Sequence, residues 1–169
     1  MSLRPGIVEC WVFRVHPRRG NVEILLIRRA AHRIFPGLWQ CVTGRVEAGE
    51  RVPMAAMREV AEETGLAPAD IEGFYDLDQI VPLYNETSDA VGTSMIFAVR
   101  VRSDAVVTMS HEHDAMRWVS DAEAPDLAIW PSYAESVRRV QELAGDPGRA
   151  RWFALDAEGY RIARRPLTG

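Results

Sequence analysis

The chain contains no lysine: all 20 of its positively charged side chains, counted without histidine, are arginine. This absence excludes Schiff-base lysines, lysine general bases and the lysine of a P-loop. The planar guanidinium of arginine, in contrast, suits bidentate contacts with phosphate. Cysteine is also scarce, and Cys10 and Cys41 both lie in apolar segments. We therefore expect two reduced core thiols and neither a disulfide framework nor a cysteine metal site.

Two further absences concern location and partners. No apolar run is long enough to span a membrane, and the first residues lack the basic stretch and apolar core of a signal peptide. The net charge is -4, so the chain has no basic excess with which to follow a nucleic-acid backbone. We therefore expect a cytoplasmic protein that binds neither membrane nor nucleic acid.

The pattern of apolar residues predicts an α/β fold with a mixed sheet between helices. A chain of 169 residues is long enough for one domain with a substantial core. Turn residues separate strand-like segments from two segments with helical spacing of their apolar residues. Strands are expected over 6–15, 22–30, 38–44, 73–84, 93–101 and 115–120, and helices over about 53–64 and 131–145.

The end of the chain predicts a β-hairpin around the turn DAEG, over residues 150–166. Four side chains alternate so as to give it one buried face: Trp152, Ala154, Tyr160 and Ile162. A two-stranded hairpin alone is marginal in water. We therefore expect a domain over 1–146 and an extension over 147–169 that packs on this domain or on the second subunit of a homodimer.

Three glutamates lie close together in the first predicted helix. Glu59, Glu62 and Glu63 have the spacing i, i+3 and i+4, which puts them on one face within about one turn. In partly desolvated surroundings two like charges about 5–6 Å apart repel by roughly 3 kcal/mol. Arg58 alone cannot neutralise three carboxylates. The pattern therefore indicates that a positive charge is missing.

A divalent cation is one candidate for that missing charge. Three hard oxygen ligands on one helical turn suit Mg²⁺ or Mn²⁺ and not a soft metal. A cation bound there would relieve the repulsion and polarise a phosphate oxygen. For these three residues taken alone, the alternative is a solvated acidic helix face.

The segment around the glutamates carries a longer pattern. It reads GRVEAGERVPMAAMREVAEETGL: a glycine, five residues, a glutamate, seven residues, and then Arg-Glu-Val-x-Glu-Glu-x-Gly-Leu. This pattern resembles the Nudix box at every defining position. The resemblance implies hydrolysis of nucleoside diphosphates linked to another moiety, with divalent cations and an activated water. It also implies the family's α/β/α sandwich.

The same resemblance implies roles for the residues of the box. The implied metal ligands are the glutamates of the helix and a backbone carbonyl before it: Gly44, Glu59, Glu62 and Glu63. Arg58 would orient the glutamates, and Glu50 would support the loop that leads into the helix.

A second segment extends the resemblance to one branch of the family. Together with LWQCVTG before the box, HEHDAMRW resembles dihydroneopterin triphosphate pyrophosphatases, in which a glutamate of a Glu-His-x-Ala-x-x-Trp setting lies near the metals. The matching Glu112 is a candidate catalytic base and metal residue, with plain loop surface as the alternative. Because metal ligation depresses the basicity of a carboxylate, we expect Glu59 to be chiefly a ligand and Glu112 the base. His113 is expected to orient a neighbour or to pack.

Three residues are candidates for contact with substrate. Arg28 and Arg29 end an apolar strand, so alternation sends one to each face, where it can reach a phosphate or simply remain solvated. Phe35, in the following loop, is a candidate for stacking on a base.

The markers of substrate class conflict. The HEHDAMRW segment favours a pterin or nucleoside triphosphate, which we expect first. By resemblance within the family, Pro82 suggests an ADP-ribose hydrolase and Tyr84 a dinucleoside polyphosphate hydrolase. An alternative of another class is a non-catalytic nucleotide-binding module, against which the intact glutamates of the box argue.

Overall fold

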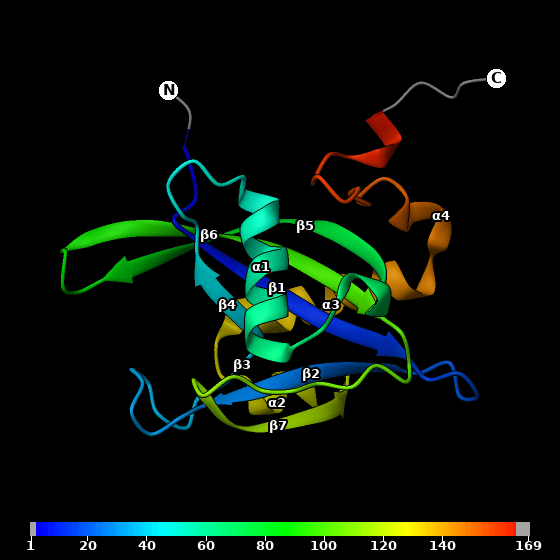
Figure 1. Cartoon of the computed structure of the whole chain (residues 1–169), viewed down its shortest axis with the longest axis horizontal. Coiled ribbons are helices and arrows are strands. Elements are labelled where there is room, and N and C mark those ends of the chain that lie inside the picture. Colours follow the sequence, from blue (N-terminus) through cyan, green and yellow to red (C-terminus); the bar gives the residue numbers. More distant parts are fainter. Residues whose placement is uncertain (1–2, 165–169) are drawn as a thin grey trace.

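The computed structural model of the protein describes residues 3–164; the first two residues and the last five of the expected extension lie outside the described part. Figure 1 shows how its elements are arranged. The strands are β1 (Ile7–Val15), β2 (Val22–Arg29), β3 (Trp39–Gln40), β4 (Val42–Arg45), β5 (Ile71–Asn85), β6 (Ala90–Val101) and β7 (His113–Ser120). The helices are α1 (Val52–Thr64), α2 (Ala124–Leu127), α3 (Pro131–Gly145) and α4 (Pro147–Ala150), with short 3₁₀ helices at Pro68–Asp70 and Ile162–Arg164.

The strands form one mixed sheet of seven strands. Its main path runs β3-β2-β1-β6-β5, while β4 pairs with β1 and β7 pairs with β2. β1 and β6 run parallel, and the other pairs are antiparallel. The expected α/β fold with a mixed sheet is confirmed.

The central strands are buried on both faces of the sheet, and their successive side chains point alternately to one face and the other. In β1, Val8, Cys10 and Val12 belong to the core beneath α1. Trp11 and Phe13 belong to the core beneath α3. α1 therefore covers one face of the sheet and α3 the other (Figure 1), which is the expected α/β/α sandwich.

Helix α1 begins and ends where its sequence predicts. Pro53 lies in the first turn, where a missing N–H removes no intrahelical hydrogen bond. Gly65 follows the last turn with φ 68°, a left-handed conformation that glycine adopts without a steric penalty. The side chains that pack on the sheet are mostly small, so the helix lies close to it: Ala55, Ala56 and Val60.

The strand expected over 38–44 is divided in two. Trp39 in β3 pairs with Arg28 of β2, whereas Gly44 in β4 pairs with Val8 of β1. The chain changes its partner strand at Cys41, between the two pieces. This change carries Gly44 to the edge of α1.

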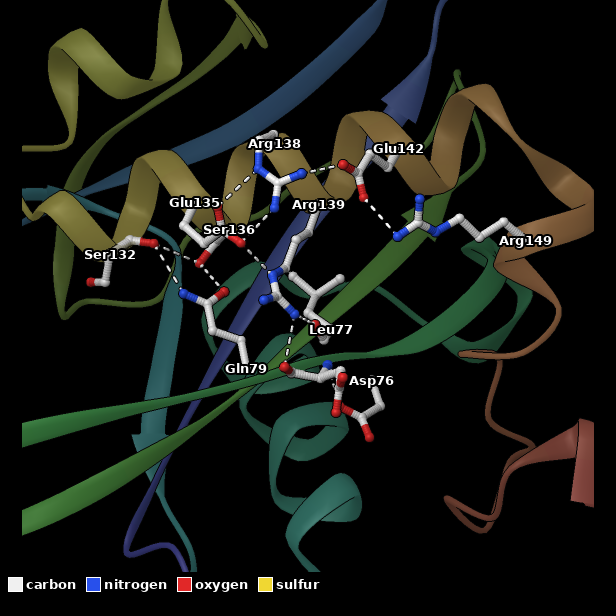
Figure 2. A network of polar contacts seen from close by, with 11 residues as sticks. Asp76, Leu77, Gln79, Ser132, Glu135, Ser136, Arg138, Arg139, Glu142 and Arg149 are labelled. Carbon is white, nitrogen blue, oxygen red and sulfur yellow. Dashed lines mark hydrogen bonds and ion pairs between the residues drawn. The ribbon is translucent and has the colours of Figure 1, made fainter.

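Helix α3 supports β5 at an irregularity of the sheet. The pairing of β5 with β6 shifts register between Asp76 and Gln79, and Asp78 has φ 52°. Arg139 of α3 donates hydrogen bonds to the carbonyls of Leu77 (2.6 Å) and Asp78 (2.7 Å). Figure 2 shows this guanidinium reaching from α3 to β5. Arg139 thus satisfies two backbone acceptors that the bulge takes out of the ladder.

The tail after α4 packs against β5. Ala154 forms an isolated antiparallel bridge with Tyr75, and Leu155 forms one with Arg161. The turn therefore lies where the sequence predicts it, but the described part of the tail contains one bridge in place of a two-stranded ladder. Leu155 is buried in the core beneath α1, and Arg161 pairs with Asp76 at 2.5 Å.

The buried face expected for this tail is wrong. Three side chains of the predicted face are at least half exposed: Trp152, Tyr160 and Ile162. The bridge to β5 turns Leu155 inward instead. Tyr160 lies over the guanidinium of Arg51 at 3.7 Å, and a Cβ on Gly159 would come within 2.7 Å of Pro53. The tail therefore closes over the first turn of α1.

The two cysteines are reduced core residues, as composition predicts. Cys10 and Cys41 are buried free thiols, and burial raises the pKa of each. Among the helices of residues 3–164, none combines the length and the apolarity needed to cross a membrane.

Candidate active site

Gly44 and Glu59 approach each other so closely that a side chain at residue 44 would meet the carboxyl group of Glu59. A Cβ built on Gly44 would lie 1.9 Å from the carboxyl carbon of Glu59. A real Cβ does not tolerate that separation, so any other residue would displace the Glu59 side chain or the strand. The glycine that opens the box pattern therefore makes room for a carboxylate supplied by α1.

Arg58 holds the neighbouring carboxylates and the loop together. Its guanidinium donates to both oxygens of Glu50 at 2.9 and 3.1 Å, to Glu59 at 2.7 Å and to Glu62 at 3.3 Å. It also donates to the carbonyl of Arg45 at 2.9 Å. These contacts use all three nitrogens of the guanidinium. Arg58 therefore contacts three carboxylates and a backbone carbonyl at once, and Glu50 is its partner from the loop.

Glu63 is a buried carboxylate without a full counter-charge. Burial, followed by the charge of Glu59, raises its pKa to about 8. Its polar neighbours are the backbone N–H of Thr43 at 3.4 Å and Nε2 of His113 at 4.0 Å. Burial also lowers the pKa of His113 to about 4, so this imidazole is neutral near pH 7. Glu63 is thus a desolvated carboxylate beside a second carboxylate, with a neutral imidazole as a neighbour.

The three glutamates of α1 are not equivalent. The side chains of Glu59 and Glu63 are 13% and 7% exposed, whereas that of Glu62 is 58% exposed. Burial raises the pKa of Glu59, although Arg58 opposes the shift. Within residues 3–164, no three His, Cys, Asp or Glu side chains are already arranged to hold a metal ion. Glu59 and Glu62 both contact Arg58 in this arrangement.

Glu112 lies close enough to this acidic cluster for its charge to act on it. Its charge contributes to the raised pKa of both Glu59 and Glu63, which places the three carboxylates in one electrostatic environment. Its carbonyl accepts a hydrogen bond from the N–H of Ala30 at 2.9 Å, and its carboxylate pairs with Arg33 at 2.8 Å. The structure therefore brings the second predicted segment beside the first.

The substrate-side candidates have different surroundings. Arg28 pairs with Asp114 at 2.7 Å on the exposed rim. Arg29 donates to the carbonyl of Ile34 at 2.5 Å, and the charges of Glu63 and Glu112 act on it. The acidic cluster therefore acts electrostatically on Arg29.

Phe35 belongs to an exposed aromatic pair. It has φ 54°, an uncommon conformation for a bulky residue, and it is 58% exposed. Its ring meets that of Trp130 edge to face, with centroids 6.2 Å apart. Trp130 precedes α3 and was not singled out from the sequence.

A second buried acid lies beneath the α3 side of the sheet. Burial raises the pKa of Glu9 to about 7, and its Oε2 has no hydrogen-bond partner among residues 3–164. Ser94 is also fully buried and acts on Glu9. The sequence did not indicate this residue, because an acid inside an apolar strand resembles the polar member of an alternating pattern. Unlike the glutamates of α1, it has no like-charged neighbour in sequence to mark it.

Comparison with known proteins agrees with this geometry. The NUDIX domain model matches residues 8–140. The chain is 37% identical over 132 residues to an octanoyltransferase of Myxococcus xanthus, a match that covers 75% of this chain and 34% of that protein. It is 32% identical over 104 residues to the NAD-capped RNA hydrolase NudC of Vibrio cholerae, covering 51% and 37%. It thus spans about a third of the length of both relatives.

A shorter match and two solved structures extend the comparison. Over 41 residues the chain is 55% identical to the dihydroneopterin triphosphate diphosphatase of Escherichia coli, covering 24% of this chain and 25% of that protein. The structure of the E. coli dihydroneopterin triphosphate pyrophosphohydrolase has a TM-score of 0.66 at 24% identity, covering 82% and 96%. The Ap4A hydrolase of C. elegans has a TM-score of 0.68 at 23% identity, covering 85% and 100%.

The chain belongs to the NUDIX domain family, because the family model covers most of its length. The class expected from the box, a Nudix hydrolase with a likeness to the dihydroneopterin triphosphate branch, is confirmed at the level of family. The two structural likenesses support the fold, and the relatives carry different substrates in their names.

Proposed function

We propose that the protein is a Mg²⁺- or Mn²⁺-dependent pyrophosphohydrolase that cleaves a phosphoanhydride bond of a nucleoside or pterin triphosphate. The observation that carries this proposal is Glu63, a buried carboxylate whose pKa is raised to about 8 by its burial and by the charge of Glu59. Glu59 lies beside it at the opening made by Gly44. An acidic, partly desolvated cluster next to an arginine-braced loop suits a hard divalent ion.

The residues that would hold the ion are those of the box: Gly44 through its carbonyl, and Glu59, Glu62 and Glu63 through their carboxylates. Glu112, to which we assign the role of base, is the alternative ligand outside the box. Since Glu59 and Glu62 both contact Arg58, the proposal requires at least one of them to exchange that partner for the ion. When bound, the ion supplies charge stabilisation to the phosphoryl oxygens and lowers the pKa of a coordinated water.

The protein's own groups divide the remaining work. We assign to Glu112 the removal of the proton from the attacking water, and to Glu59 chiefly a ligand role. Arg58 and Glu50 keep the carboxylates oriented. On the substrate side, we assign to Arg29, on which the charges of Glu63 and Glu112 act, a contact with phosphate, and to the exposed Phe35 stacking on a flat ring. Arg28, on the rim beside Asp114, is the more distant candidate.

A variant pair tests the division between Glu59 and Glu112. A positioned general base contributes typically about 10²–10⁴-fold. Glu112→Gln should therefore lower kcat strongly while the affinity for Mn²⁺ changes little, and Glu59→Gln should weaken both. The measurements are kcat over a pH series and a Mn²⁺ titration. If Glu112→Gln keeps wild-type kcat while Glu59→Gln loses turnover with intact metal affinity, the two roles are reversed.

A release assay tests the function itself. Purified protein with Mg²⁺ is incubated with nucleoside triphosphates, dihydroneopterin triphosphate, ADP-ribose and dinucleoside polyphosphates, and the phosphate, pyrophosphate and monophosphate products are quantified. Triphosphates should be cleaved fastest. Preference for ADP-ribose or a dinucleoside polyphosphate would instead favour the class suggested by Pro82 or Tyr84. Binding without any release would identify a non-catalytic module.

Location and assembly stay predictions beside this proposal. A cytoplasmic location follows from the sequence expectation, and a homodimer is the proposed assembly if the extension over 147–169 also meets a second subunit. Light scattering of the full chain measures the second of these directly.

A further inference from the structure

Arg33 forms an ion pair with the carboxylate that we assign as general base. Its Nη2 lies 2.8 Å from Oε2 of Glu112, and both side chains are about one third exposed, at 38% and 33%. Arg33 lies in the loop between β2 and β3, and Glu112 directly precedes β7. The pair therefore stands at the rim of the acidic cluster, where either partner can be reached from solution.

The two loops are joined independently of this ion pair. The N–H of Ala30 donates to the carbonyl of Glu112 at 2.9 Å. The rings of His32 and His111 stack with centroids 6.2 Å apart and an interplanar angle of 5°. The backbone positions of both loops are thus set by other contacts. Separation of Arg33 from Glu112 then requires only that side chains change rotamer.

The neighbouring arginines already contact other groups of the protein. All three guanidinium nitrogens of Arg58 are hydrogen-bonded to carboxylates and a carbonyl. Arg28 pairs with Asp114, and Nε of Arg29 donates to a backbone carbonyl. In the described chain the ion-pair partner of Arg33 is Glu112. The guanidinium occupies Oε2 of that carboxylate, so a water molecule can approach this oxygen only after the ion pair separates.

We propose that Arg33 binds the polyphosphate of the substrate and that this contact releases Glu112. The inference rests on the proposed function. A guanidinium forms stronger bidentate contacts with a multiply charged phosphate than with a single exposed carboxylate. Arg33 therefore exchanges partners when the triphosphate arrives, and Glu112 becomes available only in the complex. The exchange couples the appearance of the base to the presence of substrate.

A double-variant cycle on binding tests this exchange. The probe is a nucleoside triphosphate with methylene bridges in place of the bridging oxygens, titrated calorimetrically at saturating Mg²⁺. Arg33→Gln should weaken binding about tenfold, because a charge-assisted contact is lost. Glu112→Gln should tighten binding about threefold, because Arg33 no longer has a competing partner. In the Arg33→Gln background, Glu112→Gln should then change the affinity by less than about 1.5-fold.

The background dependence separates exchange from a simple charge effect. Loss of the Glu112 charge near a phosphate favours binding through space whether or not Arg33 is present. Tightening that persists in the Arg33→Gln background therefore overturns the proposal. Arg33→Lys should recover part of the affinity, since it restores the charge without the bidentate fork. Arg102→Gln is the matched control, because Arg102 also pairs with an exposed carboxylate, that of Asp104, outside the site.

The outcomes distinguish this inference from the proposed function. A wild-type protein that neither binds the analogue nor releases product from any substrate of the panel overturns both together. A wild-type protein that binds and hydrolyses, with Arg33→Gln unchanged in affinity and KM, overturns the exchange alone. The expected result is a KM for Arg33→Gln raised about tenfold in parallel with the weakened binding.

Discussion

Two glutamates on opposite faces of the same sheet have pKa values that are shifted in opposite directions. Glu135 on α3 contacts Arg138 and Arg139, and these hydrogen bonds lower its pKa to about 2. Glu63 on α1 is buried beside Glu59, and its pKa is raised to about 8. Both residues belong to networks of arginine and glutamate, so composition alone does not separate them.

The difference lies in charge balance and burial. Arg138 of α3 contacts Glu135 and Glu142 of the same helix, and Arg149 of α4 also contacts Glu142 (Figure 2). These partners are solvated, and each carboxylate has at least one guanidinium. On α1, a single arginine serves several carboxylates and leaves Glu63 without one. A balanced, exposed network contributes little beyond local order, whereas an unbalanced, desolvated one points to a ligand.

The strongest test of this contrast removes one carboxylate from each network. Glu63→Gln should reduce kcat by at least about 10²-fold, comparable with the loss of a charge-stabilising group from a catalytic site. The fold should persist, because the variant also removes like-charge repulsion. Glu135→Gln, the matched control, should leave kcat within about twofold of wild type. Steady-state kinetics with Mg²⁺ decides, and near-normal turnover in Glu63→Gln would exclude it as an essential ligand.

Leu155 fixes the tail in the core beneath α1, so it should contribute to the stability of the protein. Leu155→Ala should cost roughly 3 kcal/mol in unfolding free energy, through lost burial and a residual cavity. Trp152→Ala, which removes an exposed side chain of the same tail, should change the free energy of unfolding by less than about 0.5 kcal/mol. Urea unfolding of the full chain measures both. Equal effects from the two variants would mean that the tail does not depend on Leu155 for its packing.

The buried acid on the α3 side should make stability depend on pH. The pKa of Glu9 is about 7 in the folded protein against an ordinary value of 4.5. Between these values the folded protein retains a proton that the unfolded chain has released, so stability falls as pH rises. The loss should reach roughly 3 kcal/mol above pH 7.

Glu9→Gln should remove this contribution and gain stability relative to wild type at pH 8, with little difference near pH 4. Glu86→Gln, in the exposed turn between β5 and β6, should follow the wild-type curve. Urea unfolding over the pH series compares the three proteins. Parallel curves for wild type and Glu9→Gln would show that the carboxyl is not protonated on folding.

The smallest effect is expected from adding one methyl group beside each helix. Gly44→Ala places a Cβ against Glu59 and should lower kcat about tenfold, with a stability cost of about 1–3 kcal/mol. A Cβ on Gly145, at the end of α3, meets nothing within 4 Å. Gly145→Ala should therefore be neutral or slightly stabilising. Matched activity of the two variants would show that the strand at residue 44 yields easily.

The sequence was informative where a local pattern determines the outcome. Alternation predicted most of the strands, and Pro53 and Gly65 bracket a helix whose glutamates lie where helical spacing places them. Spacing could not reveal that Glu62 faces solvent while Glu63 is buried, because burial depends on the sheet beneath α1. The division of the strand over 38–44 depends likewise on which partner strand each half meets.

Residues whose main contacts are with distant segments of the chain are harder to predict from the sequence. Three such residues lie in segments far apart in sequence: Arg33, Trp130 and Glu9. Each is notable because of a neighbour that comes close only in the folded chain. The tail shows the same limit. Its alternation was visible, but the bridge between Ala154 and Tyr75 decides which side faces the core.

The contact between the tail and α1 can form only late in synthesis, because its two residues are far apart in sequence. Arg51, just before α1, donates to the carbonyl of Gly159, a residue 108 positions later. At about 5–20 residues per second, a ribosome needs roughly 5–20 s to add that stretch. The helix that carries the glutamates is therefore made long before the segment that closes over its first turn. Completion of this end of the site is a late event in the biogenesis of the protein.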